Sequence, residues 1–140
     1  MVFLTIEDYD KQIRSENLDR VIDSNSVILD DAEASAILRI TGYLDGRYDM
    51  AAEFAKTGSE RNALLVTLTI DLVLYDVLSR INPRNIPELR MQRRDEATDV
   101  LKKTNEEKLN NWGLTERLNE DGDAIEFTFV RSNQKNEYLY

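Results

Sequence analysis

The longest apolar run of the chain lies at residues 61–81 and reads RNALLVTLTIDLVLYDVLSRI. Its 13 apolar residues in 21 positions predict a helix about 31 Å long. On a helical wheel one polar stripe remains, formed by Thr69, Asp76 and Arg80. Asp76 and Arg80 have the i,i+4 spacing and the order of an exposed ion pair. A helix that is apolar almost all round either spans a membrane or is enclosed by other elements of the fold.

The charges and boundaries of this run favour an enclosed core helix. Two aspartates interrupt it, and its longest charge-free stretch, residues 62–70, is shorter than the roughly 20 residues that cross a bilayer. Ser59 is expected to cap the helix, because its hydroxyl can accept a backbone N–H. The Asn82-Pro83 pair is expected to end it, since proline cannot continue the hydrogen-bond ladder.

Helical spacing of apolar residues recurs before the core helix. A first short helix follows Thr5, which can cap it, and Ser15 is expected to cap a second one. Residues 27–44 predict a longer helix with a core-facing stripe. Gly46 is expected to adopt the left-handed conformation that often ends a helix. Residues 51–54 are expected to form a single helical turn.

Residues 87–103 predict the last helix, with Pro87 at its first position, where a backbone N–H is not needed. Its apolar stripe is weak, which is typical of an outer helix. The predicted fold is therefore mainly α, a compact bundle of about four helices around the apolar helix at 61–81.

The composition changes after residue 103. Residues 104–123 are rich in Asn, Glu, Lys and Asp, which indicates a linker. Residues 125–129 alternate between apolar and polar, as in a strand with one apolar face, and residues 137–140 are expected to return as a second strand. The apolar positions of this arm are Ile125, Phe127, Phe129, Tyr138 and Tyr140. We therefore divide the chain into a helical domain at 1–103 and a linker with a β arm at 104–140. A lone hairpin is marginally stable, so the arm should lean on the helices or pair with another chain.

The composition removes most catalytic chemistry. The chain has 140 residues, the usual size of one domain, and it contains neither cysteine nor histidine. Thiol nucleophiles, thiolate metal sites and the commonest general base are therefore excluded. The sequence has no glycine-rich phosphate loop, and its N-terminal residues do not resemble a signal peptide. Three acidic pairs are expected to be helix-cap, surface and loop residues: Asp30-Asp31, Asp95-Glu96 and Asp121/Asp123. We expect no enzyme activity, no catalytic residue, no cofactor and no metal.

The net charge of −9 should repel DNA. The one basic stretch, residues 80–103, holds seven bases against four acids. Its main interpretation is a solvated helix face, and its arginines are candidate interface residues together with the apolar positions of the arm. A DNA-binding protein would have to use the same four arginines: Arg84, Arg90, Arg93 and Arg94.

Asp71 falls among leucines on the helical wheel, so it is expected to be at least partly enclosed. An enclosed carboxylate needs a positive partner or backbone donors. We expect it to pair with an arginine, Arg47 being the first candidate, or to cap a neighbouring helix. The functional alternative is a polar contact across a subunit boundary. Asp71 and Arg47, with Asp76 and Arg80, are thus the expected structural polar residues.

Several short segments stand in a recognisable order. They are FLTIEDY at 3–9, YLDGRYD at 43–49, RNAL at 61–64, the stretch from Asp71 to Tyr75, and LSRI at 78–81 followed by Pro83 and Pro87. Together they resemble proteins of Mu-like phages and prophages, a group similar to the head–tail connector, or head completion, proteins of tailed phages. The likeness covers about residues 3–103.

The resemblance implies a compact helical subunit of the virion neck without a catalytic site. Many copies, commonly twelve, would form an adaptor ring that binds the portal protein, extends the DNA channel and supports the next neck or tail protein. DNA would pass through the channel without specific binding. The subunit would be assembled in the host cytoplasm, with no membrane involved.

A second class of function stays open at this point. A small regulatory module, without a ring, could dock a partner protein through the C-terminal hairpin. Deleting residues 104–140 separates the two hypotheses. A regulator would lose its partner while the helical body stayed folded, whereas an adaptor would lose its ring or its attachment to the portal.

Overall fold

The computed structural model describes residues 2–118, which are mainly helical. The elements are α1 (Ile6–Asp10), α2 (Ser15–Ile22), α3 (Ser26–Leu44), α4 (Met50–Ala55), the 3₁₀ turn η1 (Gly58–Glu60), α5 (Ala63–Ile81) and α6 (Glu88–Asn105). Within residues 2–118 there is no strand, and an isolated bridge pairs Tyr48 with Glu116. The predicted mainly α fold is confirmed for this part of the chain, whereas the predicted β arm at 125–140 lies outside it.

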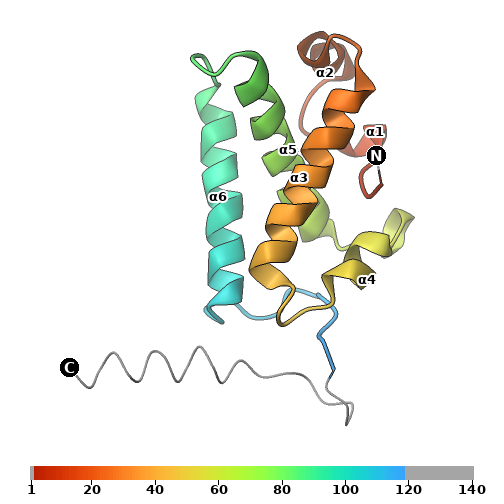
Figure 1. Ribbon diagram of the computed structural model, residues 1–140, viewed down its shortest axis with the longest axis vertical. Coiled ribbons are helices and arrows are strands. Elements are labelled where there is room, and N and C mark those ends of the chain that lie inside the picture. Colours follow the sequence, from red (N-terminus) through yellow and green to blue (C-terminus); the bar gives the residue numbers. More distant parts are fainter. Residues whose placement is uncertain (1, 119–140) are drawn as a thin grey trace, which may run out of the picture.

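Three long helices make up the body (Figure 1). α5 packs along both α3 and α6, and α3 also contacts α6. The shorter α2 lies at the upper end of the view and α4 at the lower end. Ten residues of α5 are buried, and Leu65, Val73 and Val77 are 0% exposed. The prediction that this helix is enclosed by other helices of its own chain is therefore confirmed.

The polar stripe predicted on α5 is only partly present. Thr69 is fully buried, and its hydroxyl donates a hydrogen bond of 2.7 Å to the carbonyl oxygen four residues earlier. A hydroxyl satisfied inside its own helix does not need water, which explains the burial. Asp76 and Arg80 are more accessible, but no ion pair joins them among the described residues.

The cap of α5 is Asn62, not the predicted Ser59. The Asn62 side-chain oxygen accepts the Leu65 N–H at 3.1 Å, and its amide nitrogen donates to the Trp112 carbonyl oxygen at 3.0 Å. Ser59 lies inside the 3₁₀ turn η1, one turn too early. The sequence did not reveal this short turn, so the helix start was placed before its true position. The predicted end at Asn82 is confirmed.

Replacing Asn62 by alanine is expected to lower the free energy of unfolding by about 1–2 kcal/mol, because the Leu65 N–H loses its acceptor. Ser59→Ala is the matched control and should change the free energy by less than about 0.5 kcal/mol. Urea unfolding followed by circular dichroism measures both. Equal losses in the two variants would contradict the assignment of the cap.

The other helix starts agree with the sequence to within one residue. Thr5 caps α1 as predicted, and its N–H donates to Asp8 Oδ2 at 2.7 Å. Ser15 is the first residue of α2 and Arg14 holds the cap position. Pro87 likewise precedes the first residue of α6.

The prediction for Gly46 is wrong. Among the described glycines, positive φ angles occur at Gly58 and Gly113. α3 ends instead through Asp45 in the right-handed region. Asp45 and Tyr48 donate their N–H groups to the carbonyls four residues earlier, at 2.8 and 3.0 Å. These right-handed turns satisfy the helix end without a left-handed residue.

The chain returns to the body after α6, beneath the lower ends of the helices (Figure 1). Leu114 is 4% exposed, and the Trp112 indole N–H donates to the Thr104 hydroxyl at 3.0 Å. The Asp49 N–H donates to the Thr115 carbonyl oxygen at 2.8 Å. The packed body therefore continues beyond residue 103, where the composition changes.

Candidate functional site

Three of the four arginines expected at an interface lie on α6 and contact their own chain. Arg90 Nη2 donates to the Gln12 carbonyl oxygen at 2.7 Å, and Arg93 donates to the Gln12 side-chain oxygen. The Arg94 guanidinium lies over the Tyr75 ring, 4.7 Å from its centroid. These contacts tie α6 to the link between α1 and α2 and to α5.

The fourth arginine, Arg84, is exposed in the loop between α5 and α6. Of the four candidate arginines, Arg84 is therefore the one that a partner protein can reach most readily. The remaining candidate interface residues lie outside the described part of the chain: Ile125, Phe127, Phe129, Tyr138 and Tyr140.

Asp71 is buried, as predicted. The prediction that Arg47 is its partner is wrong. Arg47 lies beyond the end of α3 and forms an ion pair with Glu107 at 3.0 Å. Asp71 is 8% exposed, and its Oδ1 atom has no hydrogen-bond partner in the described part of the chain. Burial raises the pKa of Asp71 to about 6, and the positive charges of Arg93 and Arg90 on α6 offset only part of this rise.

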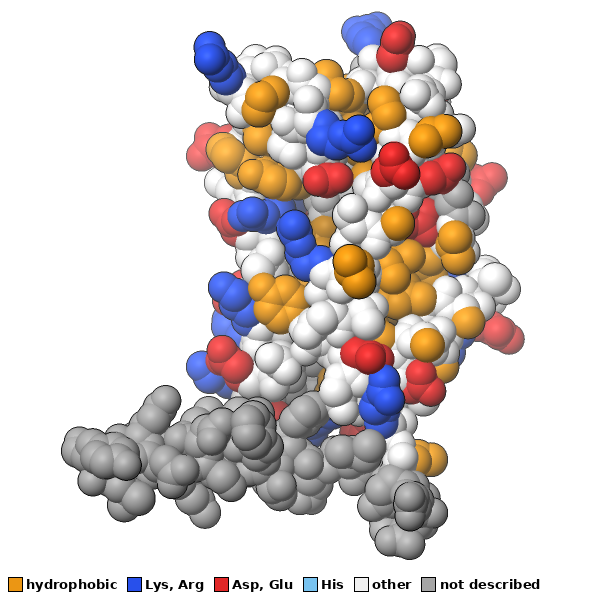
Figure 2. Space-filling model, in the orientation of Figure 1, with side chains coloured by type: hydrophobic (Ala, Val, Ile, Leu, Met, Phe, Trp, Pro, Cys, Tyr) orange, Lys and Arg blue, Asp and Glu red, His pale blue; other side chains and the backbone are white. Residues whose placement is uncertain are grey.

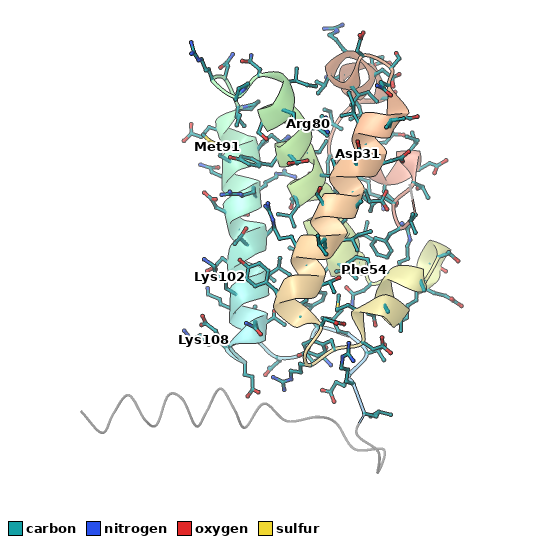
Figure 3. The ribbon with its side chains drawn as sticks, in the orientation of Figure 1. Asp31, Phe54, Arg80, Met91, Lys102 and Lys108 are labelled. Carbon is teal, nitrogen blue, oxygen red and sulfur yellow. The ribbon has the colours of Figure 1, made fainter. Side chains whose placement is uncertain are left out.

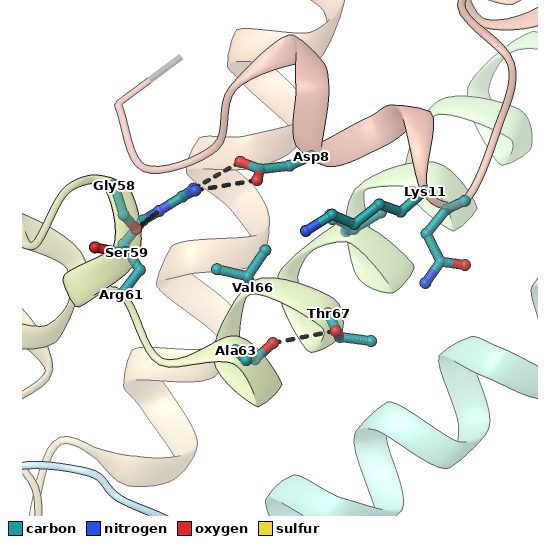
Figure 4. A pocket seen from close by; sticks show the side chains of 10 residues that line it. Asp8, Lys11, Gly58, Ser59, Arg61, Ala63, Val66 and Thr67 are labelled. Carbon is teal, nitrogen blue, oxygen red and sulfur yellow. Dashed lines mark hydrogen bonds and ion pairs between the residues drawn. The ribbon is translucent and has the colours of Figure 1, made fainter.

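A polar cleft of about 340 Å³ lies between α1, η1 and the start of α5 (Figure 4). Arg61 crosses it and donates to both carboxylate oxygens of Asp8, at 2.6 and 3.0 Å. It also donates to the carbonyl oxygens of Phe3 and Gly58, each at 2.9 Å. Because Nε, Nη1 and Nη2 of Arg61 are all engaged, this guanidinium holds the N-terminal segment against α5. Lys11 is the other basic side chain of the lining.

The electrostatics of the Asp8–Arg61 pair follow from its geometry. Burial alone would raise the pKa of Asp8, but the hydrogen bonds from Arg61 and Thr5 and the charge of Arg61 bring it below its ordinary value. The hydrogen bond to Asp8 raises the pKa of Arg61. Both charged forms are therefore favoured by the fold.

Glu33 is a second buried acid that binds the N-terminal segment. It is 2% exposed, and its Oε1 atom accepts the backbone N–H groups of Val2, Phe3 and Leu4 at 3.1, 2.6 and 3.2 Å. Its Oε2 atom is buried, and none of the described residues donates a hydrogen bond to it. Glu33 and Arg61 thus fix residues 2–8 from two sides.

Glu53 fixes the segment that follows α6. It is 0% exposed, and its Oε1 atom accepts from the Thr115 N–H at 2.8 Å, the Thr115 hydroxyl at 2.7 Å and Lys56 Nζ at 3.0 Å. Burial favours the neutral acid, but these hydrogen bonds outweigh it and lower the pKa of Glu53. The charged carboxylate therefore attaches the end of the described chain to α4.

The chemistry of these buried acids is acceptance of hydrogen bonds from backbone groups, an arginine and a lysine. Over residues 2–118, no cluster of three or more potential metal ligands is found. No helix in this part of the chain is long and apolar enough to cross a membrane.

Sequence reasoning did not single out Glu33 or Glu53. The sequence nevertheless contains a signal for each of them, because each is an acid on the apolar face of its helix. Glu33 follows Leu29 by four residues and Ala32 directly, and both of these are buried. An acid in such a position needs several donors, but the pattern does not say where in the chain the donors lie.

Comparisons of the chain with protein-family models, with curated proteins and with solved structures give no match.

Proposed function

We propose that this chain is a structural virion protein of a tailed phage, a subunit of the head–tail connector ring. In this role it binds the portal protein, joins it to the neck or tail, extends the DNA channel and carries out no catalysis. The proposal rests on the resemblance of residues 3–103 to connector proteins of Mu-like phages and on the use that the fold makes of the same residues.

The observation that carries the proposal is the place of the resemblance-bearing segments in the fold. FLTIEDY and RNAL meet through the Asp8–Arg61 pair, and Asn62 caps α5. YLDGRYD supplies the buried Tyr48 and the N-cap of α4, Asp49. Each of these segments therefore holds elements of the fold together. A structural subunit needs such contacts, whereas an enzyme would need reactive groups in addition.

The surface charges suit a ring. A closed ring of identical subunits needs heterologous contacts, in which two different patches of the subunit meet. The last turn of α5 and the loop that follows it expose Arg80 and Arg84, whereas α3 exposes Asp30 and Asp31. Patches of opposite sign on one subunit can attract each other between neighbours, and the net charge of −9 favours a channel that does not hold DNA.

The test is electron microscopy of the full chain mixed with the portal protein of the same genome. We expect a ring on one face of the portal, and we expect a variant lacking residues 119–140 to lose the ring or the attachment. A chain that never joins the portal at any concentration would contradict the proposal. Capture of a non-virion partner, lost on the same truncation, would instead favour a regulatory module.

A further inference from the structure

An apolar groove of about 380 Å³ runs along α3, between the N-terminal segment and α4. Figure 2 shows it as a hollow lined by hydrophobic side chains. Its apolar walls are formed by Val2, Ala34, Ile37, Leu38 and Phe54. Leu38 is 75% exposed and Val2 is 84% exposed. An exposed apolar hollow of this kind offers a surface on which the apolar side chains of a further segment can pack.

The floor of the groove carries an unused acceptor. Glu33 is among the lining residues and is 2% exposed, and no hydrogen-bond donor within residues 2–118 reaches its Oε2 atom. A buried carboxylate oxygen without a donor is costly. An occupant that brings an N–H or O–H group would therefore be favoured over a purely apolar one.

The dimensions of the groove fit a short strand. Its α3 residues extend from Asp30 to Thr41, a rise of about 16 Å along the helix. Residues 125–129 of this chain, IEFTF, would span about 13 Å as a strand. Three apolar side chains, Ile125, Phe127 and Phe129, would then face one way.

The described chain ends within reach of this groove. Thr115 is hydrogen-bonded to Asp49, the N-cap of α4, and Phe54 of α4 forms one wall of the groove. From these neighbours we estimate that Leu118 and Phe54 lie at most about 23 Å apart. The link at 119–124 can reach about 24 Å when extended. The chain's own residues 125–129 can therefore enter their own groove at its α4 end.

Entry at the α4 end sets the direction of the segment in the groove. Figure 3 shows Phe54 beside the lower half of α3 and Asp31 on its upper half. A strand that enters beside Phe54 would place Phe129 near Asp30 at the far end. Arg131 follows two residues later and would lie toward Asp30, an acidic lining residue at that end of the groove. The apolar side chains of residues 125–129 thus match the apolar walls of the groove, and the positive charge of Arg131 matches the acidic far end.

We propose that residues 125–129 of the free subunit occupy the α3 groove of their own chain, with Arg131 at its acidic end. This contact covers the exposed apolar surface of α3. It goes beyond the connector function and does not depend on it.

Disulfide trapping in the full chain tests the contact, because the protein has no cysteine of its own. The variant Leu38→Cys/Phe127→Cys is oxidised at low concentration. The control is Leu89→Cys/Phe127→Cys, since Leu89 is an apolar α6 residue that is also exposed, at 52%. We expect an intrachain disulfide that forms at least about tenfold faster in the groove variant, because the tethered segment has a high effective concentration. Adding Arg131→Glu should slow it.

Three outcomes would overturn the proposal. Equal rates of disulfide formation in the groove and control variants would show that the segment meets both sites only by random collision. The absence of any disulfide would show that the segment lies elsewhere. Disulfides formed only between copies, seen as covalent dimers on a non-reducing gel, would assign the groove to the segment of a neighbouring chain. Failure of the unmodified full chain to bind the portal, beside fast intrachain trapping in the groove variant, would remove the connector function alone, so the two failures are distinguishable.

Discussion

Replacing Asp8 by alanine is expected to lower the free energy of unfolding by roughly 3–5 kcal/mol. The Asp8 and Arg61 side chains are 6% and 11% exposed and lie 2.6 Å apart. Removing the carboxylate leaves a buried guanidinium without its counter-charge, and it also removes the acceptor for the Thr5 N–H. Urea unfolding at pH 7, followed by circular dichroism, measures the loss.

Asp95→Ala is the matched control for this prediction. Asp95 also pairs with an arginine, Arg94, at 3.0 Å, but its side chain is 68% exposed. The variant should change the free energy of unfolding by less than about 1 kcal/mol, because exposed ion pairs contribute little. A change below 1 kcal/mol in Asp8→Ala as well would contradict the assignment of the buried pair as a joint of the fold.

Replacing Asp71 by asparagine is expected to raise the free energy of unfolding at pH 8 by up to about 3 kcal/mol. Burial raises the pKa of Asp71 from 3.8 to about 6, and each tenfold change in proton affinity corresponds to about 1.4 kcal/mol. The native state holds this proton more tightly than the unfolded state. The stabilisation from the proton is complete below pH 3.8 and is lost as the pH rises to about 6. Asparagine resembles the neutral form and escapes that loss.

The pH dependence of the difference between the two proteins is the decisive readout. The wild type and the Asp71→Asn variant both lose stability in acid through Asp8 and Glu53, because the pKa values of these two carboxyl groups are lowered in the fold. The advantage of Asp71→Asn should therefore vanish near pH 4 and be complete at pH 8. Asp76→Asn, more accessible on the same helix, should stay within about 0.5 kcal/mol of the wild type at both pH values. A less stable Asp71→Asn at pH 8 would show that the carboxylate is ionised and paired with Arg90 or Arg93.

The helices could be predicted from the sequence because their apolar periodicity is strong. The run at 61–81 has so few polar positions that only an enclosed helix satisfies it, and the structure places α5 between α3 and α6. The start of α5 was harder to predict, because Ser59 and Asn62 are both good caps. The choice between them depends on the short turn η1, which has no periodic signature.

The partners of the buried charges could not be predicted, because they depend on contacts between distant parts of the chain. Among the described residues Asp71 has no ion pair, and Arg47 pairs instead with Glu107, a residue 60 positions away from it in the chain. Three backbone N–H groups converge on Glu33 only after the N-terminal segment has crossed α3. The burial of Asp71 could be predicted from the apolar pattern around it in the sequence, whereas the residues that surround it could be identified only from the structure.

Native mass spectrometry of the full chain bound to the portal protein tests the connector proposal most directly. The account predicts one discrete complex in which the copy number of this chain matches the symmetry of the portal, commonly twelve. A portal that retains its own mass when the chain is present in excess, or that binds scattered numbers of copies, would contradict it.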